Sequence, residues 1–256
     1  MTTSMPKTVL ITGGAKRIGK VITETLSADG WAVAIHYFGS SDEAVSLAKS
    51  ITDANGQAEV FSADLNDPDA TEDLISAVVD SMGPLGALIN NASIFEKEGW
   101  DDVTPDSWAQ HLEINLHAPF VLSQALARAL PDELDGAIVN IIDQRVFNLT
   151  PEFVSYTVSK TGLWTLTQTL AMALAPRIRV NGVGPGPTLP NERQTEEIFE
   201  RQVSSTPLQR QVEPDDIAAA VKYLLSARSV TGEMIAVDSG EHLGWTQSKE
   251  GQSLNG

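Results

Sequence analysis

The chain has no cysteine among its 256 residues, which excludes both a disulfide framework and thiolate catalysis. Basic residues are also scarce, because 17 Lys and Arg stand against 34 Asp and Glu, a formal net charge of −17. This excess argues against nucleic acid or an anionic membrane as a partner, since both would be repelled. No apolar run reaches the ~18 residues that a membrane span requires, and residues 1–7 are too polar for a signal peptide. We expect a cytoplasmic protein.

Apolar, strand-like runs alternate with helix-period segments along the chain. The expected strands are 8–11, 32–36, 58–62, 86–89, 137–142, 179–183 and 233–237, and the expected helices are 18–29, 41–54, 68–82, 105–130, 155–175 and 214–226. Helices of this length between strands imply right-handed crossovers and a parallel sheet. The pattern predicts a single α/β domain over 1–256, with a doubly wound, parallel, seven-stranded, Rossmann-like sheet and helices on both faces.

Two segments depart from this alternation. Residues 184–210 follow the sixth strand with Pro185, Pro187 and Pro190 and then a charged stretch, and we predict a lid over a substrate there. The tail, 246–256, is polar, and it is expected to be disordered or to dock on a neighbour.

A glycine-rich turn, Thr12-Gly13-Gly14-Ala15-Lys16-Arg17-Ile18-Gly19, joins the first strand to the first helix. Small residues let the backbone approach a pyrophosphate, and the start of the helix supplies free N–H groups. The turn is not of the G-x-G-x-x-G form, and a plain strand-to-helix turn is the alternative. Its place in the first βαβ unit favours cofactor binding through Gly13, Lys16, Arg17, Ile18 and Gly19.

The second strand ends in His36-Tyr37-Phe38-Gly39-Ser40-Ser41, with no acid before Asp42. An NAD site usually places an acid near this point to accept from the ribose 2′-hydroxyl. Lys16 and Arg17 instead offer positive charge to a 2′-phosphate, and Ser40 offers a hydroxyl. The sequence therefore favours NADP(H), with His36 and Tyr37 beside it. Two solvated surface cations are the alternative.

Polar and small residues also follow the third and fourth strands. Asp64 and Leu65 close the third strand, where Asp64 can accept from an adenine amino group or cap the helix ahead of Pro68. Asn91 and Ala92 follow the fourth strand and suit close approach to a nicotinamide ribose, although Asn is also an ordinary turn former.

Asp143, Tyr156 and Lys160 carry the expected chemistry. Tyr156 and Lys160 are four residues apart, so a helix places both on one face. An ammonium near a phenol favours the phenolate, and we expect Lys160 to lower the pKa of Tyr156 toward neutrality so that the phenol can act as a proton donor. Asp143 follows an Ile- and Val-rich strand at the end where substrates bind in open α/β folds. A capping or loop aspartate and a plain surface Tyr–Lys pair are the alternatives.

Asn115 precedes Pro119 by one turn in the expected helix 105–130. Proline has no N–H, so the carbonyl of Asn115 loses its helical partner, and we expect a kink there with a freed C=O that needs water. Simple bending of the helix is the alternative.

Together these motifs resemble the short-chain dehydrogenase/reductase family over nearly the whole chain. The family's glycine turn, Asn-Asn-Ala, Tyr-x-x-x-Lys and Pro-Gly segments recur in order at 13–19, 90–92, 156–160 and 185–186. The resemblance implies that Pro185 and Gly186 line the cofactor, and that Lys160 holds the nicotinamide ribose. It also implies that Asn115 holds a water that passes protons to Lys160, and that the subunits form a homotetramer through the helix holding Tyr156. The alternative is that the apolar residues of this helix pack within one subunit.

Arg17 and Asp143 depart from most family members, which have a small residue and a serine there. Both changes resemble the pteridine reductase and dihydromonapterin reductase branch. By that resemblance Ser93 contacts a pterin, Phe95 stacks on it, and Arg17, Asp143 and Tyr156 also touch it. An aspartate suits a heterocyclic C=N bond, because it can hydrogen-bond to the phenol and help pass a proton to ring nitrogen.

Three functions follow as hypotheses. The first is an NADPH-dependent reductase of a small pterin-type imine, and the second is a reductase of an oxo-acyl, sugar or other carbonyl substrate. The third is a dinucleotide sensor without catalysis, which the intact Tyr156 and Lys160 argue against. Asp143 argues against the second. None of the three requires a metal.

Overall fold

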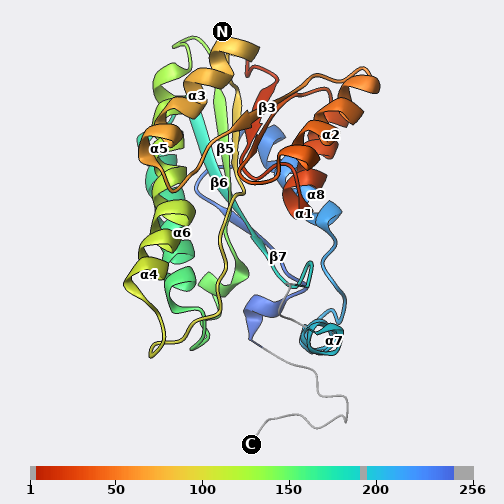
Figure 1. The fold of residues 1–256 in the computed structure, drawn as a ribbon, viewed down its shortest axis with the longest axis vertical. Coiled ribbons are helices and arrows are strands. Elements are labelled where there is room, and N and C mark those ends of the chain that lie inside the picture. Colours follow the sequence, from red (N-terminus) through yellow and green to blue (C-terminus); the bar gives the residue numbers. More distant parts are fainter. Residues whose placement is uncertain (1–3, 191–194, 245–256) are drawn as a thin grey trace, which may run out of the picture.

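The computed structural model describes residues 4–190 and 195–244. Seven parallel strands form one sheet in the order β3-β2-β1-β4-β5-β6-β7 (Figure 1). The strands are β1 Thr8–Ile11, β2 Ala32–Tyr37, β3 Ala58–Ser62, β4 Ala87–Asn90, β5 Gly136–Ile141, β6 Ile178–Pro185 and β7 Met234–Val237. The expected fold, a doubly wound parallel sheet with helices on both faces, is confirmed.

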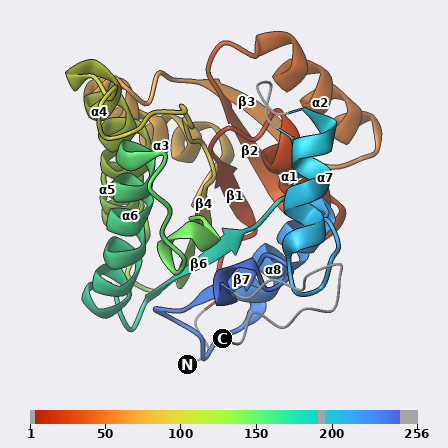
Figure 2. The ribbon, with the colours of Figure 1, turned by 90° about the horizontal axis from the view of Figure 1, so that it is seen from below.

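Helices cover both faces of this sheet. Their bounds are α1 Arg17–Ala28, α2 Ser41–Asp53, α3 Pro68–Met82, α4 Pro105–Leu112, α5 Ala118–Ala129, α6 Val154–Ala173, α7 Glu196–Ser205 and α8 Pro214–Ser226. Helices α1, α2 and α8 pack on one face, and α3, α5 and α6 pack on the other (Figures 1 and 2). Three short elements remain: the π-helical turn η1 Glu113–His117 and the 3₁₀ turns η2 Gln144–Val146 and η3 Glu241–Leu243.

Strand β1 shows why the central strands are apolar throughout. Val9 and Ile11 lie in the core cluster under α1, α2 and α8, whereas Leu10 lies in the cluster under α3 and α5. Successive side chains of a strand point to opposite faces, and both faces of this sheet are covered. Every residue of the strand is consequently buried.

Local sequence fixes several helix starts. Asp67 accepts hydrogen bonds from the N–H groups of Asp69 and Ala70, and Pro68 follows in the first turn of α3. The capping alternative for Asp64 is therefore wrong, because Asp67 performs that role. The Asp64 carboxylate instead accepts from the N–H of Asn66 at 2.9 Å and closes its own turn.

The order of the strands places a crevice at their carboxyl ends. From β1 the chain crosses to β2 and β3 on one side, and from β4 it proceeds to β5, β6 and β7 on the other. Strands β1 and β4 are neighbours, so the connections that leave them diverge. Ligands of open α/β sheets bind outside the carboxyl ends at such a point.

Three differences from expectation concern the longer connections. The expected helix 105–130 is interrupted by the π turn η1, where the N–H of Ala118 bonds to the carbonyl of Glu113. The expected lid, 184–210, contains the helix α7, which the sequence pattern did not predict. Strand β6 continues to Pro185 because β7 pairs with its last residues.

The expected tail, 246–256, lies outside the described residues, as do 191–194 of the lid. Among the described helices none is long and apolar enough to cross a membrane.

Candidate active site

The glycine turn between β1 and α1 brings two stretches of backbone very close together. Gly13 has φ +61°, a conformation that glycine adopts without strain. A Cβ added to Gly19 would lie 2.1 Å from the carbonyl oxygen of Gly13, so only glycine fits there. The helix begins at Arg17 and, within the described part of the chain, no side chain caps its start. Its first N–H groups are available to a bound anion, which is what a pyrophosphate requires.

Neighbouring strands hold this turn from behind. The side-chain amide of Asn91 donates to the carbonyls of Thr12 at 2.9 Å and Gly13 at 3.2 Å. The Thr12 hydroxyl accepts from the N–H groups of Asn91 at 2.9 Å and Ala92 at 3.0 Å. Asn91 and Ala92 therefore shape the turn as well as lining the cavity beside it.

His36 supports the turn from the end of β2. Its Nδ1 accepts the N–H of Gly13 at 3.1 Å, so the proton resides on Nε2, which faces the carbonyl of Ala63 at 3.0 Å. The ring is almost fully buried, and burial lowers the pKa of His36. Both ring nitrogens are occupied by protein, which makes His36 a brace for the glycine turn. His36 also lines the cavity, where its contact with a cofactor was predicted.

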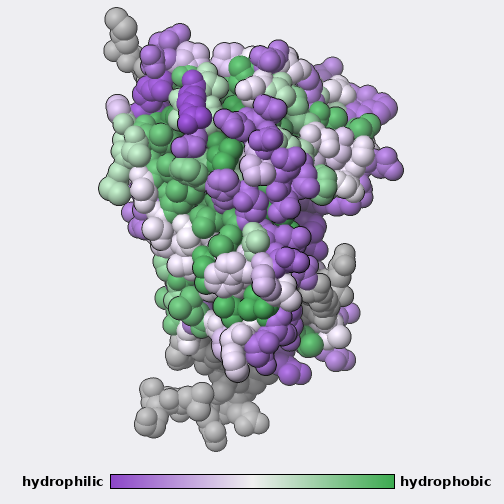
Figure 3. Space-filling model, turned by 60° about the vertical axis from the view of Figure 1, so that its left-hand side comes forward, coloured by the Kyte–Doolittle hydropathy of each residue, from purple (hydrophilic) through white to green (hydrophobic). Residues whose placement is uncertain are grey.

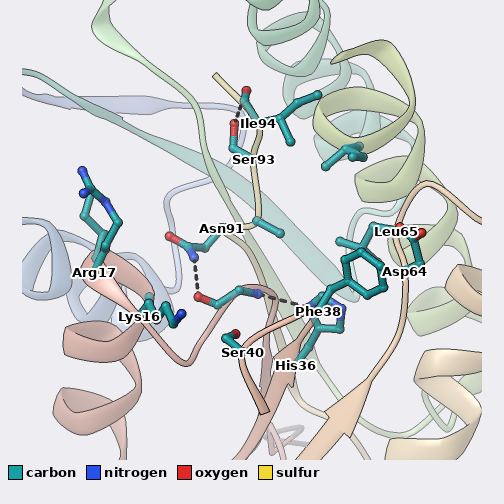
Figure 4. Close-up of a pocket in the computed structure, with 15 residues that line it drawn as sticks. Lys16, Arg17, His36, Phe38, Ser40, Asp64, Leu65, Asn91, Ser93 and Ile94 are labelled. Atoms are coloured by element: carbon teal, nitrogen blue, oxygen red, sulfur yellow. Dashed lines mark hydrogen bonds between the residues drawn. The ribbon is translucent and has the colours of Figure 1, made fainter. Parts of the chain in front are cut away.

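A cavity of about 390 Å³ lies between this turn and the ends of β2, β3 and β4 (Figure 4). Most predicted cofactor residues line it: Gly13, Lys16, Arg17, Ile18, Gly19, His36, Ser40, Asp64, Leu65, Asn91 and Ala92. Ser93 extends the lining toward α4, as do Ile94 and Ile114, which the sequence analysis missed.

Phe38 is a further residue that sequence analysis missed. It lines the cavity with 65% of its surface exposed, and Figure 4 shows it beside Asp64 and Leu65. An exposed aromatic ring at this end offers a flat face to a base. Tyr37, which was predicted instead, packs partly buried against the core and is absent from the described cavity lining.

The two cations of the turn are engaged by other groups. Lys16 forms an ion pair with Glu43 at 2.6 Å. An acid from the first turn of α2 therefore lies beside a cation that was predicted to meet a 2′-phosphate. Arg17, at φ +51°, donates to the carbonyl of Pro190 at 3.3 Å and to that of Leu189 at 3.4 Å. Both side chains line the cavity, and Arg17 also joins it to the start of the expected lid.

The catalytic candidates meet where β5 ends and α6 begins. The Tyr156 hydroxyl donates to Oδ2 of Asp143 at 2.8 Å, and Oδ1 of Asp143 accepts the N–H of Arg145 at 2.7 Å. Asp143 is thus held facing the phenol and does not turn toward bulk solvent. Lys160 is buried on the same helix one turn away, with Nζ 5.9 Å from the centre of the Tyr156 ring.

The expectation that Lys160 lowers the pKa of Tyr156 is wrong in this structure. Burial, and then the negative charge of Asp143, raise the pKa of Tyr156 well above its usual value. Lys160 is directed elsewhere, since its Nζ donates to the carbonyl of Ile141 at 2.8 Å. Burial lowers the pKa of Lys160 to about 8. The phenol consequently keeps its proton at neutral pH, as a proton donor must.

Asn115 lies fully buried in the π turn, one turn before Pro119. The irregularity expected in the helix takes the form of a widened turn, and the water at the Asn115 carbonyl stays a prediction. The side-chain amide donates to the Ser159 hydroxyl at 3.1 Å and to the carbonyl of Ile94 at 3.0 Å. Its oxygen accepts from the N–H of Ile94 at 2.9 Å and from the Ser93 hydroxyl at 3.1 Å. Asn115 therefore ties the loop after β4 to α6.

Phe95 lies beside Tyr156, as its predicted role requires. The two rings meet edge to face, with centroids 4.6 Å apart. One face of Phe95 is covered by Phe153, whose ring is parallel to it at 4.4 Å, and Arg145 lies over Phe153 at 4.9 Å. Phe153 and Arg145 are further residues missed in the sequence. Their closeness to Asp143 in the chain was the only available signal.

Pro185 ends β6 and Gly186 follows it, and neither is among the described residues that line the cavity. A Cβ on Gly186 would lie 2.6 Å from Cα of Asp238, and its N–H bonds to the carbonyl of Val237 at 3.0 Å. Gly186 lets the chain just after β7 pass close by, and the contact of Pro185 and Gly186 with a cofactor stays a prediction.

Comparison with known proteins agrees with this geometry. A family model described as enoyl-(acyl carrier protein) reductase matches residues 13–242. L-rhamnose 1-dehydrogenase (NAD(P)(+)) of Azotobacter vinelandii is 34% identical over 91% of this chain and 96% of that protein. The 3-oxoacyl-[acyl-carrier-protein] reductase FabG of Staphylococcus epidermidis is 29% identical over 93% of this chain and all of that protein.

Two solved structures are more similar. FolM alternative dihydrofolate reductase 1 from Brucella canis, complexed with NADP, is 48% identical with a TM-score of 0.91 over 94% of this chain and 96% of that one. The protein of the same name from Brucella suis, also with NADP, is 47% identical with a TM-score of 0.91 over 98% and 99%. By its matched residues, its fold and its Tyr-x-x-x-Lys helix, the chain belongs to the short-chain dehydrogenase/reductase family and resembles its FolM members.

Proposed function

We propose that this chain is an NADPH-dependent reductase that converts a dihydropteridine, such as dihydromonapterin, to its tetrahydro form. The observation that carries the proposal is the hydrogen bond from Tyr156 to Asp143. Most members of the family have a serine hydroxyl there, which suits a developing alkoxide. A carboxylate that accepts from the phenol is better suited to protonation of a ring nitrogen. The 48% identity to FolM alternative dihydrofolate reductase 1 supports the same substrate class.

The family and its NADP-containing relatives make NADP(H) the cofactor, and the cavity fits it. The close pass of Gly13 and Gly19 leaves the backbone open to a pyrophosphate, at the uncapped start of α1. Lys16, Arg17 and Ser40 all line the cavity, and they would offer positive charge and a hydroxyl to a 2′-phosphate. Bound NADPH would supply the hydride.

The chain's own residues handle the proton. Tyr156 keeps a proton on its hydroxyl oxygen at neutral pH, since burial and Asp143 raise the pKa of the phenol. Asp143 fixes the direction of that hydroxyl and offers a second oxygen for a proton that returns from solvent. Lys160 donates one N–H to the carbonyl of Ile141 and has two more to donate to a ribose.

A second candidate is a reductase of ketone substrates. Its support is the similarity of the chain to L-rhamnose 1-dehydrogenase and to 3-oxoacyl-[acyl-carrier-protein] reductase. Asp143 weighs against it, because a carboxylate beside the reacting carbonyl would repel a developing alkoxide.

A substrate panel tests both candidates. NADPH oxidation would be followed with dihydrobiopterin, dihydromonapterin, dihydrofolate and simple ketones. Turnover of the pterins supports the proposal, and turnover of ketones alone removes it. Binding of NADPH without turnover of any compound would favour the non-catalytic sensor.

We also propose that the chain assembles as a homotetramer through the side of the molecule that carries α4, α5 and α6. Figure 3 brings that side forward, and hydrophobic residues gather on it. On α6, Met172 is 75% exposed and Val158 is 43% exposed. Light scattering coupled to gel filtration measures the mass directly. Met172→Glu is expected to shift it toward smaller species, and a monomeric wild type would refute the proposal.

A further inference from the structure

Behind the catalytic tyrosine lies a buried polar cluster, the Glu98 network, made of Glu98, Ser107, His111 and Ser155. Glu98 is only 7% exposed, and a buried carboxylate is costly unless hydrogen bonds satisfy it. The Ser155 hydroxyl donates to Oε1 of Glu98 and the Ser107 hydroxyl donates to Oε2. Both carboxylate oxygens are therefore satisfied by hydroxyls from two different helices, α6 and α4.

His111 completes the network and fixes its proton. Its Nε2 accepts the N–H of Glu96 at 3.3 Å, so the proton of the neutral ring resides on Nδ1. Nδ1 faces the carbonyl of Ser107 at 2.9 Å and the Ser155 hydroxyl at 2.9 Å. It also lies 3.8 Å from Oε1 of Glu98. His111 is fully buried, so each of its polar atoms is used by protein.

The network holds two backbone segments at the substrate end of the site, the loop after β4 and the start of α6. The loop after β4 is held at Glu96, through His111, and at Glu98. The start of α6 is held at Ser155, and Phe153 donates its N–H to the carbonyl of Glu98 at 2.7 Å. Phe153 has φ +60°, a left-handed conformation that is strained for a residue with a Cβ. Such strain persists only where surrounding contacts determine the backbone.

Phe95 and Phe153 are the side chains that these restraints place, and together they form the aromatic wall. Phe95 precedes Glu96 in the held loop, and Phe153 precedes Ser155 by two residues. Their parallel stack at 4.4 Å and the edge contact of Phe95 with Tyr156 at 4.6 Å follow from that anchoring. The His111 ring lies 6.4 Å from the Tyr156 ring.

We propose that Glu98 and His111 are positioning residues, which fix the aromatic wall against Tyr156 and so set how a flat substrate meets the proton donor. An apolar cluster would hold α4 and α6 together at lower cost, because burying a carboxylate is expensive. What the polar network adds is direction, since each hydrogen bond allows only one register of loop against helix. The inference rests on the proposed reductase function only for its kinetic consequences.

The test compares Glu98→Ala with Glu98→Gln, which keeps the shape and one accepting oxygen. Asn181→Ala is the matched control, because Asn181 is equally buried and holds two backbone partners, Val230 and Glu233, away from the wall. For Glu98→Ala we expect a rise in substrate KM of about tenfold and a fall in kcat of similar size, with unchanged affinity for NADPH. Glu98→Gln is expected to recover most of the loss, and Asn181→Ala to lower only the Tm.

Hydrogen exchange separates this inference from the proposed function, because it needs no substrate. In Glu98→Ala the amides of 94–100 and 153–157 are expected to exchange faster, and those of 13–19 to stay unchanged. If no pterin is turned over by the wild type, the function fails while the exchange and NADPH results still decide this inference. Three results for Glu98→Ala would overturn the inference. Affinity for NADPH could fall as much as affinity for substrate, the amides of 13–19 could exchange faster by the same factor as those of 94–100 and 153–157, or the kinetics could match those of Asn181→Ala.

If Glu98→Ala does not fold, Ser155→Ala takes its place in the test, because it removes only one hydroxyl of the network. We expect the same direction, with a rise in KM of about threefold, since only the contacts of this hydroxyl with Glu98 and His111 are lost. An unchanged KM with a lowered Tm would then overturn the inference.

Discussion

The two ends of the site are built on different physical principles. At the cofactor end, neutral groups hold the backbone: His36 and Asn91 hydrogen-bond to the glycine turn, and the Thr12 hydroxyl within the turn accepts the N–H of Asn91. At the chemical end, ionisable side chains are buried together, with Tyr156 against Asp143 and Lys160 close by. The first arrangement creates space and backbone donors for an anion. The second shifts the pKa values of Tyr156 and Lys160. Burying these groups costs stability, and the shifted pKa values lie where the reaction needs them.

This contrast predicts that substitutions at one end change binding and those at the other change kcat. Tyr156→Phe should show the largest effect, a fall in kcat of about 10²–10⁴-fold, because the only transferable proton of the phenol is lost. Affinity for NADPH, measured by fluorescence titration, should not change. Tyr223→Phe on α8 is the control, since that ring is exposed. Loss of NADPH binding in Tyr156→Phe would break the contrast.

Asp143→Ala should be next in size, with a fall in kcat of roughly 10²-fold or more and nearly unchanged affinity for NADPH. The phenol loses its acceptor at 2.8 Å and with it a fixed direction. Asp143→Asn should retain more activity, because the amide oxygen can still accept. If Asp143→Ala kept wild-type kcat with every substrate, the carboxylate would have no part in proton transfer.

Gly19→Ala tests the cofactor end alone. Its Cβ would meet the Gly13 carbonyl at 2.1 Å, so the turn must shift. A shift of this kind typically costs 1–3 kcal/mol, and we expect affinity for NADPH to fall about 10- to 100-fold. At saturating NADPH, kcat should be close to that of the wild type. A variant with normal affinity and low kcat would show that the two ends are coupled.

Arg17→Ala sharpens the same side of the comparison. The wild type should prefer NADPH to NADH by about tenfold or more in kcat/KM, since a charge-assisted phosphate contact is worth roughly 1.5–3 kcal/mol. In the variant this preference should largely disappear. Lys20→Ala is the control, because Lys20 lies on α1 paired with Glu24. Equal use of both cofactors by the wild type would remove the charge argument for Lys16 and Arg17.

Lys160→Met tests stability, where the expected change is small and is a gain instead of a loss. Burial lowers the pKa of Lys160 from 10.5 to about 8, so at pH 7 the folded protein carries a buried charge at a cost. We expect Met to raise the free energy of unfolding at pH 7 by about 1–2 kcal/mol while activity is lost. The gain should shrink as pH rises from 8 to 10.5, where the folded wild type releases its proton before the unfolded chain. Urea titrations at pH 7 and pH 10 measure it.

Much of the fold was predictable because its signals are local. All seven strands were located to within two residues at either end, and Pro68 and Pro214 marked the starts of two helices. The helix α7 was missed because its sequence lies between proline-rich stretches. Its Thr195 cap and the burial of Phe199 are visible only once the chain has folded.

The site divides in the same way. The turn and the Tyr156–Asp143 contact were predictable, since a strand end and a helix face fix both positions. The Glu98 network was not, because Ser155 is 57 residues from Glu98 and no local pattern joins them. The direction of the Tyr156 pKa was also missed. Spacing placed Lys160 near the phenol, whereas burial and Asp143 dominate its titration.

The π turn at 113–117 has a consequence for how relatives of this chain should be aligned. A π turn holds one more residue than a regular helical turn. Removing that residue would leave the helix nearly as long, yet would rotate everything before it by roughly 100° relative to α5. Asn115 would then no longer face Ser159. A relative with an asparagine in this helix but one residue fewer before Pro119 therefore lacks the equivalent amide, however similar its letters are.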